Sequence, residues 1–240
     1  MNFANREVCD LYVLDYNTKK PVLYCDYANT NTTELTSESV FAYGGKGHPR
    51  RVGFNGEKGG TFTFETQLQS YQLYALITGG DLGTTSKYVG REVVTCETSG
   101  TLTIEGTAIA GSVNVFAEDD DCGTALEATV AGTTITCASA TSGSKYIVYY
   151  LYEIASGVQS IKIKSTSFPK ACIIYADTLE KTEDDQFLPY HMIVHKAQPQ
   201  ANISLSNSNS GDPGTLSVVF DLLADENDDM ITLDLLESED

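Results

Sequence analysis

The sequence predicts a mainly β fold of the α+β class, and three observations support this prediction. Short runs rich in β-branched and aromatic residues recur along the chain, each bounded by Gly, Asn, Asp or Ser. Apolar residues recur at helical spacing in only one segment. The chain has 240 residues, of which 41% are hydrophobic and 20% charged, which is enough to bury a core and argues against global disorder. One helix among many strands indicates a β-sandwich or barrel.

The first half of the chain contains four predicted strands, which are Val8–Tyr16, Val22–Tyr27, Arg51–Phe54 and Thr61–Thr66. Residues 17–21 are predicted to form the turn between the first two strands. The glycine-rich residues 55–60 are predicted to form a hairpin turn between the last two. Phe62 and Phe64 alternate with threonines, so we expect the last strand to have one apolar and one polar face.

One helix is predicted over Gln67–Thr78. Its apolar face consists of Leu68, Tyr71, Ala75 and Leu76, which recur at helical spacing. The pair Gly79-Gly80 follows and is typical of a helix C-cap. We expect this helix to pack on a sheet.

The second half continues in strands, and its middle differs in composition. The predicted strands are Glu92–Cys96, Gly111–Phe116, Thr133–Cys137, Lys145–Glu153, Ser160–Lys164, Ala171–Tyr175, Tyr190–His195, Ile203–Ser206, Leu216–Asp221 and Ile231–Leu235. The stretch 98–157 is rich in Thr, Ala, Gly and Ser and has short strands. We therefore expect 98–157 to form a small, Ig-like β-sandwich domain, inserted into a discontinuous β domain made of residues 1–97 and 158–240.

The composition excludes several classes of protein. Lys and Arg number 15 against 33 Asp and Glu, which gives a formal net charge of −18. A nucleic-acid clamp needs clustered cations and is therefore not expected. No apolar run reaches the roughly 18–20 residues of a membrane span, and the first residues do not resemble a secretory signal. We expect a reducing compartment at synthesis, with Cys9, Cys25 and Cys172 as buried free thiols inside apolar runs.

The motifs of enzymes and metal sites are missing. His191 and His195 lie four residues apart in a predicted strand, which separates them by about 13 Å, too far for one ion. The acidic run Glu118–Asp121 lacks the ligand spacing of an EF-hand loop, so we expect a solvated loop. The glycines of residues 44–53 lack phosphate-loop spacing and a following helix. We expect no catalytic residue, no metal and no cofactor.

The charges are distributed unevenly. The segment 44–60 holds four cations, Lys46, Arg50, Arg51 and Lys58. Residues 221–240 hold no Lys or Arg and nine acidic residues, which are Asp221, Asp225, Glu226, Asp228, Asp229, Asp234, Glu237, Glu239 and Asp240. One interpretation is a solvated loop and a solvated tail. The other is a head-to-tail contact between copies, with the four cations facing Asp225, Asp228 and Asp229; repeated contacts of this kind generate rings or tubes.

Two parts of the sequence carry a family resemblance. Gly44–Thr66 and the following helix form one part, and Lys196–Ser206 with Gly211–Asp225 forms the other. They resemble the long loop, hairpin and helix, and the closing strands, of tailed-bacteriophage tail tube proteins. The resemblance covers roughly residues 1–95 and 158–235. Residues 98–157 are similar to the accessory β domains that some tail proteins carry on the outside.

This resemblance implies a fold and a function. The implied fold is a tail-tube-like β-sandwich or barrel of two packed sheets with one flanking helix. The implied function is self-assembly into stacked hexameric rings that form the virion tail tube and conduct DNA to the host. Implied partners are other copies and the tape measure, terminator, baseplate or tip, and sheath proteins. Genomic DNA would pass the lumen without specific binding, and assembly would take place in the bacterial host cytoplasm.

An alternative from a different class stays open. A non-enzymatic β binding module, such as a capsid decoration or a carbohydrate-binding virion surface protein, also fits a β-rich chain without catalytic motifs. The chain has no Trp, which argues against sugar binding, although it has 14 Tyr. Tyrosines on strands more often belong to a core or an interface than to a ligand platform.

Overall fold

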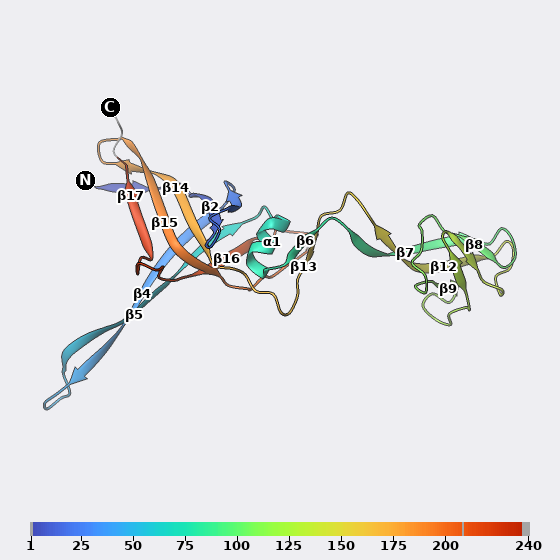
Figure 1. The fold of residues 1–240 in the computed structure, drawn as a ribbon, viewed down its shortest axis with the longest axis horizontal. Coiled ribbons are helices and arrows are strands. Elements are labelled where there is room, and N and C mark those ends of the chain that lie inside the picture. Colours follow the sequence, from blue (N-terminus) through green and yellow to red (C-terminus); the bar gives the residue numbers. More distant parts are fainter. Residues whose placement is uncertain (1, 208, 237–240) are drawn as a thin grey trace. The chain divides into compact units, whose positions relative to one another are not determined.

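Strands make up nearly all of the regular secondary structure of the described residues, which confirms the predicted fold class. The computed structural model describes residues 2–207 and 209–236, and it is 53% strand and 3% helix. Antiparallel sheets pack together, and the described residues contain one helix and no closed barrel (Figure 1). Contacts divide the chain into two units. The first holds the residues up to Leu82 and those from Ile161 onward, and the second holds Gly83–Ser160.

The first unit is built on a sheet of nine strands. These are β1 (Phe3–Asn5), β2 (Asp10–Asp15), β3 (Pro21–Cys25), β4 (Thr30–Tyr43), β5 (Arg50–Thr66), β14 (Cys172–Thr182), β15 (Phe187–Pro199), β16 (Leu216–Leu222) and β17 (Ile231–Leu235). The main path runs β3-β2-β14-β15-β16-β5-β4, so β3 and β4 lie at its opposite ends.

The long strands β14 and β15 form the centre of this sheet, because each pairs with two strands on its outer side. β14 pairs with β2 over Cys172–Asp177 and with β1 over Glu180–Thr182. β15 pairs with β17 over Tyr190–Val194 and with β16 over Ala197–Pro199. The strands predicted at the start and end of the chain therefore meet on this central pair.

One face of the sheet is apolar and covers the core of the first unit. Its fully buried side chains include Leu11, Val13, Phe62, Phe64, Ile174, Val194 and Phe220. The ring centroids of Phe62 and Phe64 lie 6.1 Å and 6.2 Å from that of Phe220. The alternation predicted for Phe62 and Phe64 is confirmed, since both point into this core.

The helix α1 (Tyr71–Thr78) packs against the same core and is shorter than predicted. Ser70 is its N-cap, and the Ser70 hydroxyl accepts a hydrogen bond of 3.1 Å from the Leu73 amide. Leu68 therefore lies before the helix and is exposed, which contradicts its predicted place on the buried face. The buried apolar side chains of the helix are Leu73, Leu76 and Ile77. Gly79 ends the helix with φ 66°, as predicted.

The hairpin of β4 and β5 differs most from the prediction. The expected turn at residues 55–60 is wrong, because these residues lie inside β5 and the chain reverses at residues 44–49. The pairing shifts register between Ser37 and Ser39, so the β5 glycines accompany a bulge instead of a turn. β4 is not predicted because residues 30–39 contain Leu35 as their only apolar side chain.

The second unit contains two sheets of three strands around a core of its own. One sheet has the order β10-β11-β8 and the other β7-β12-β9. The strands are β7 (Ser86–Thr95), β8 (Thr101–Thr103), β9 (Asn114–Ala117), β10 (Thr129–Ala131), β11 (Thr134–Thr136) and β12 (Lys145–Ile154). Its core includes Cys96, Leu102, Val115, Ile135 and Val148.

The unit boundaries differ from the expected 97/98 and 157/158. β7 pairs with β12 along its whole length, so residues 86–95 belong to the second unit. The pair β6 (Asp81–Gly83) and β13 (Ser160–Lys162) forms where the chain passes from one unit to the other. The predicted strand Ile203–Ser206 is wrong, since this stretch has no regular structure.

All six cysteines are free thiols, and only Cys122 is exposed. The five buried ones include Cys9, Cys25 and Cys172, as predicted. Burial raises the pKa of the Cys172 thiol to about 12 and that of Cys9 to about 11. The thiolate is the reactive form, so these two thiols are inert in the folded chain.

We predict that a maleimide added to the folded protein at about pH 8 modifies Cys122 quickly and the other five cysteines only after unfolding. Mass spectrometry of the intact protein and its peptides measures this selectivity. Cys122→Ser is the control and should abolish fast labelling. Labelling of Cys9 or Cys172 at the rate of Cys122 would contradict the buried placement.

Gly60 allows close approach of strands at the base of the hairpin. A Cβ at Gly60 would overlap the Glu34 carbonyl oxygen and lie 3.1 Å from Leu222 Cδ1. A Cβ at Gly59 would meet only Thr36 Oγ1, at 3.7 Å. We predict that Gly60→Ala lowers the free energy of unfolding by roughly 1–3 kcal/mol in urea denaturation. The matched control Gly59→Ala should stay near wild type, and equal losses from both would show that crowding at Gly60 is not the cause.

Candidate functional site

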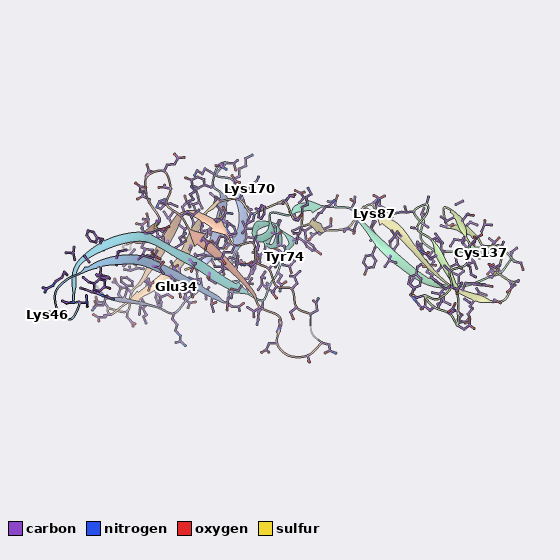
Figure 2. The ribbon with its side chains drawn as sticks, turned by 90° about the horizontal axis from the view of Figure 1, so that it is seen from below. Glu34, Lys46, Tyr74, Lys87, Cys137 and Lys170 are labelled. Carbon is purple, nitrogen blue, oxygen red and sulfur yellow. The ribbon has the colours of Figure 1, made fainter. Side chains whose placement is uncertain are left out.

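The outer half of the β4–β5 hairpin, residues 35–58, is here called the arm. Figure 1 shows it leaving the rest of the sheet, and Figure 2 shows Lys46 at its far end. The nine residues Leu35–Tyr43 span roughly 30 Å at strand spacing. Every residue of the arm is exposed except Phe41 and Gly44, which are half-buried. The arm is therefore a two-stranded ribbon with no layer packed on it among the described residues.

One face of the arm carries a cluster of apolar side chains near its end, here called the tip patch. Val40 pairs with Phe54 and Ala42 with Val52, so the four side chains are neighbours on one face. Val40 is 67%, Phe54 59% and Val52 51% exposed. From the sequence, only the charged residues of this segment were candidates for a contact between copies. The alternation Val52-Gly53-Phe54 is the signal that could have found the patch, but its partners on β4 follow only from the register.

The two arginines of the arm are held by the arm itself. Arg50 Cζ lies 4.3 Å from the centroid of the Phe41 ring. A Cβ at Gly53 would lie 3.1 Å from the same ring, so Phe41 lies across Gly53. Arg51 Nε donates a hydrogen bond of 3.3 Å to the Gly44 carbonyl oxygen. Among the described residues, neither arginine has a carboxylate partner, and both residues are exposed.

Lys58 lies at the base of the arm and close to two of the predicted acidic residues. Lys58, Leu35, Asp228 and Asp229 line one shallow pocket between the hairpin and the loop that precedes β17. The structure thus brings one predicted cation and two predicted acids together within one copy. Lys46, Arg50 and Arg51 do not line this pocket.

Asp225 organises the same loop. Its Oδ1 accepts hydrogen bonds from the backbone amides of Asn227, at 2.8 Å, and Asp229, at 2.9 Å. These bonds hold the pKa of Asp225 below its usual value, the Asn227 amide contributing most. Asp228 adopts a left-handed conformation with φ 67°. The remaining predicted acids Glu237, Glu239 and Asp240 lie outside the described residues.

The hairpin base and β16 share a second surface, here called the polar face. It consists of the residues that alternate with the buried Phe62, Phe64 and Phe220, namely Thr30, Thr32, Glu34, Thr61, Thr63, Glu65, Ser217, Val219 and Asp221. Glu34, Glu65 and Asp221 are its only charges, and all are negative. Gln200 Nε2 donates a 2.8 Å hydrogen bond to Asp221. The polar face is hydroxyl-rich and anionic.

The acidic loop of the second unit is fixed by an ion pair. Arg91 Nη2 lies 2.8 Å from Asp121 Oδ2, and the Tyr149 hydroxyl donates a 3.0 Å hydrogen bond to Asp121 Oδ1. The Arg91 hydrogen bond is the main reason why the pKa of Asp121 is lowered. All four residues of the acidic run are exposed, in agreement with the predicted solvated loop, and Asp121 is in addition paired with Arg91.

The described residues contain neither a cluster of metal-ligating side chains nor a membrane-spanning helix. Within residues 2–207 and 209–236, no three side chains of His, Cys, Asp or Glu lie together as metal ligands would. No helix in the described part of the chain is long and apolar enough to cross a membrane.

Comparison with known proteins identifies the family. No curated protein matches the chain significantly. The model of the YomU/Tube protein family matches residues 5–233, and therefore spans both units. This is a phage-derived tube family, in agreement with the tail tube resemblance. Because this match covers most of the 240 residues, the chain belongs to the YomU/Tube protein family.

Proposed function

We propose that this chain is the subunit of a phage tail tube, which self-assembles into stacked hexameric rings and conducts DNA to the host. The arm carries this proposal. A two-stranded ribbon is at best marginally stable in water when nothing packs on it. The arm adds an exposed apolar tip patch and two arginines that have no carboxylate partner among the described residues, so contact with another copy would stabilise it.

The polar face supports a role as the wall of the tube. It bears carboxylates and hydroxyl groups but no cation, so it offers DNA phosphates no cationic partner and its carboxylates repel them. Its opposite side is the apolar core, so the same strands can pack inward and face water outward. Repulsion from the wall acts only over about 8–10 Å at physiological ionic strength, which keeps the effect local to the lumen.

The open edges of the sheet support ring closure. β3 and β4 end the main path, and their outer backbone groups have no strand partner among the described residues. Such edges pair with strands of other chains unless they are protected. The proposed partners beyond other copies are the tape measure, terminator, baseplate or tip, and sheath proteins of the virion tail. Assembly of the tail from these proteins would take place in the host cytoplasm.

Reversing the charges of the two arginines of the arm tests the electrostatic part of the proposal. We predict that Arg50→Glu with Arg51→Glu leaves the subunit folded and abolishes tube formation, because the charges that face the next copy are reversed. Negative-stain microscopy and circular dichroism measure the two effects. Lys87→Glu with Lys162→Glu makes the same change of charge at two exposed positions outside the arm and should leave tubes intact. Normal tubes from the arm variant would refute the role of the arm, and wild-type protein that stays monomeric in every condition would refute the proposed function.

Replacing two apolar side chains of the tip patch tests the apolar part of the proposal. Burying a Val or Phe side chain contributes about 1.5–3 kcal/mol. We therefore predict that Val40→Ser with Phe54→Ser raises the protein concentration needed for assembly by at least about tenfold. Light scattering against concentration measures this threshold.

The matched control for this pair is Val93→Ser with Phe168→Ser. These two side chains are also exposed, but they lie outside the arm. The control variant should assemble at the wild-type threshold. Equal shifts from both pairs would show that the tip patch has no special part in assembly.

A further inference from the structure

The outer face of the main sheet, opposite the core, presents a row of tyrosines. Tyr24 on β3 pairs with Tyr12 on β2, and Tyr12 pairs with Tyr175 on β14. The rings of Tyr12 and Tyr24 lie 4.9 Å apart, and the three side chains are 49%, 40% and 37% exposed in the order Tyr24, Tyr12, Tyr175. The row continues with Ile193 on β15. This surface is here called the tyrosine face.

A row of carboxylates lies beside the tyrosines on the same face. Asp10 pairs with Asp177, Asp177 with His191, and His191 with Asp234. Strands are about 4.8 Å apart, so this row is roughly 14 Å long. His191 Nε2 lies 4.0 Å from Asp177 Oδ1 and is the only basic group in the row. The tyrosine face is thus aromatic along one line and anionic along the next.

More apolar side chains extend this surface. Val22, Leu179 and Phe187 are exposed on β3, β14 and β15. A contiguous apolar surface with a polar border marks an interaction site more often than an ordinary protein surface does. Lys181, which follows Leu179 on the same side of β14, is already paired with Asp185 and lies over the Phe187 ring at 5.3 Å. The row of carboxylates itself contains no Lys or Arg.

The end of the arm has the complementary chemistry. Residues 39–56 contain three cations, Lys46, Arg50 and Arg51, and no Asp or Glu, in a chain of net charge −18. Arginine binds carboxylates through paired hydrogen bonds and lies favourably over tyrosine rings. The tip patch supplies apolar side chains that match the aromatic row in kind. Both the charges and the apolar surfaces of the two sites are therefore complementary.

The two sites lie on opposite ends of one sheet. The arm extends from β4 and β5 at one end of the strand order, and the tyrosine face lies on β3, β2 and β14 at the other. We propose that the arm of one copy docks on the tyrosine face of a second copy. This inference rests on the proposed function and specifies its receptor surface. A contact between two different surfaces of identical chains is head-to-tail and propagates, as a tube requires.

The acidic loop 225–229 is the rival receptor, and its features fit the arm less well. Asp225 is engaged by the amides of its own loop. Asp228 and Asp229 already share a pocket with Lys58 of the same copy. The loop contains no aromatic residue to receive the tip patch.

A photo-cross-link identifies the receptor directly. Phe54→p-benzoylphenylalanine retains an aromatic ring in the tip patch, and assembled tubes are irradiated and digested for mass spectrometry. We expect cross-linked peptides that contain residues 10–15, 21–25 or 172–179 of another copy. Cross-links confined to residues 223–230, or to the second unit, would overturn the proposal.

A charge swap gives an independent test that does not depend on the cross-linker. Asp10→Lys with Asp177→Lys should abolish tubes alone and restore them when combined with Arg50→Glu and Arg51→Glu. The matched swap uses Asp228→Lys and Asp229→Lys in place of the first pair and should not restore them. With all variants folded by circular dichroism, failure of the first swap to rescue, or rescue by the second, overturns the receptor assignment. The proposed function fails separately, if wild-type protein forms no tubes.

Discussion

The structure depends on one constraint: the β4–β5 ribbon continues far beyond the core that supports its base. At the base, Phe62 and Phe64 are buried between β16 and the rest of the core, and cross-strand pairing is reinforced by packing. Beyond the pocket at Lys58 the same pairing continues through residues that are almost all exposed. Backbone hydrogen bonds alone contribute little net stability in water. The chain therefore places apolar side chains where only another molecule can bury them.

The sequence predicts much of the fold where local patterns decide it. Ile231–Leu235 and the Gly79 cap are found as predicted, because β-branched runs and a left-handed glycine are local signals. The prediction of the hairpin turn is wrong because it also rests on a local signal. Glycines at residues 55–60 have the composition of a turn, but a bulge opposite Ser37–Ser39 absorbs them into β5. Nothing in the polar sequence of β4 indicates a strand until its partner is known.

The candidate site could be predicted only in part. The cations of the arm and the acids of the C-terminal segment are visible as charge runs. The tip patch needs the register that places Val40 beside Phe54, and the tyrosine face needs pairings between β2 and β14, about 160 residues apart in the chain. Long-range register is not encoded in local periodicity. The proposed contact therefore combines the charges that are visible in the sequence with exposed apolar surfaces that only the structure reveals.

Hydrogen exchange of the arm measures the central claim most directly. Amides of residues 35–58 are compared between dilute protein and assembled tubes by mass spectrometry, with the core strand β14 as internal reference. We expect fast exchange in the arm of the dilute subunit and strong protection in the tube, because the ribbon is stabilised only when another copy packs on it. An arm equally protected, or equally unprotected, in both states would contradict the claim that another copy stabilises the arm.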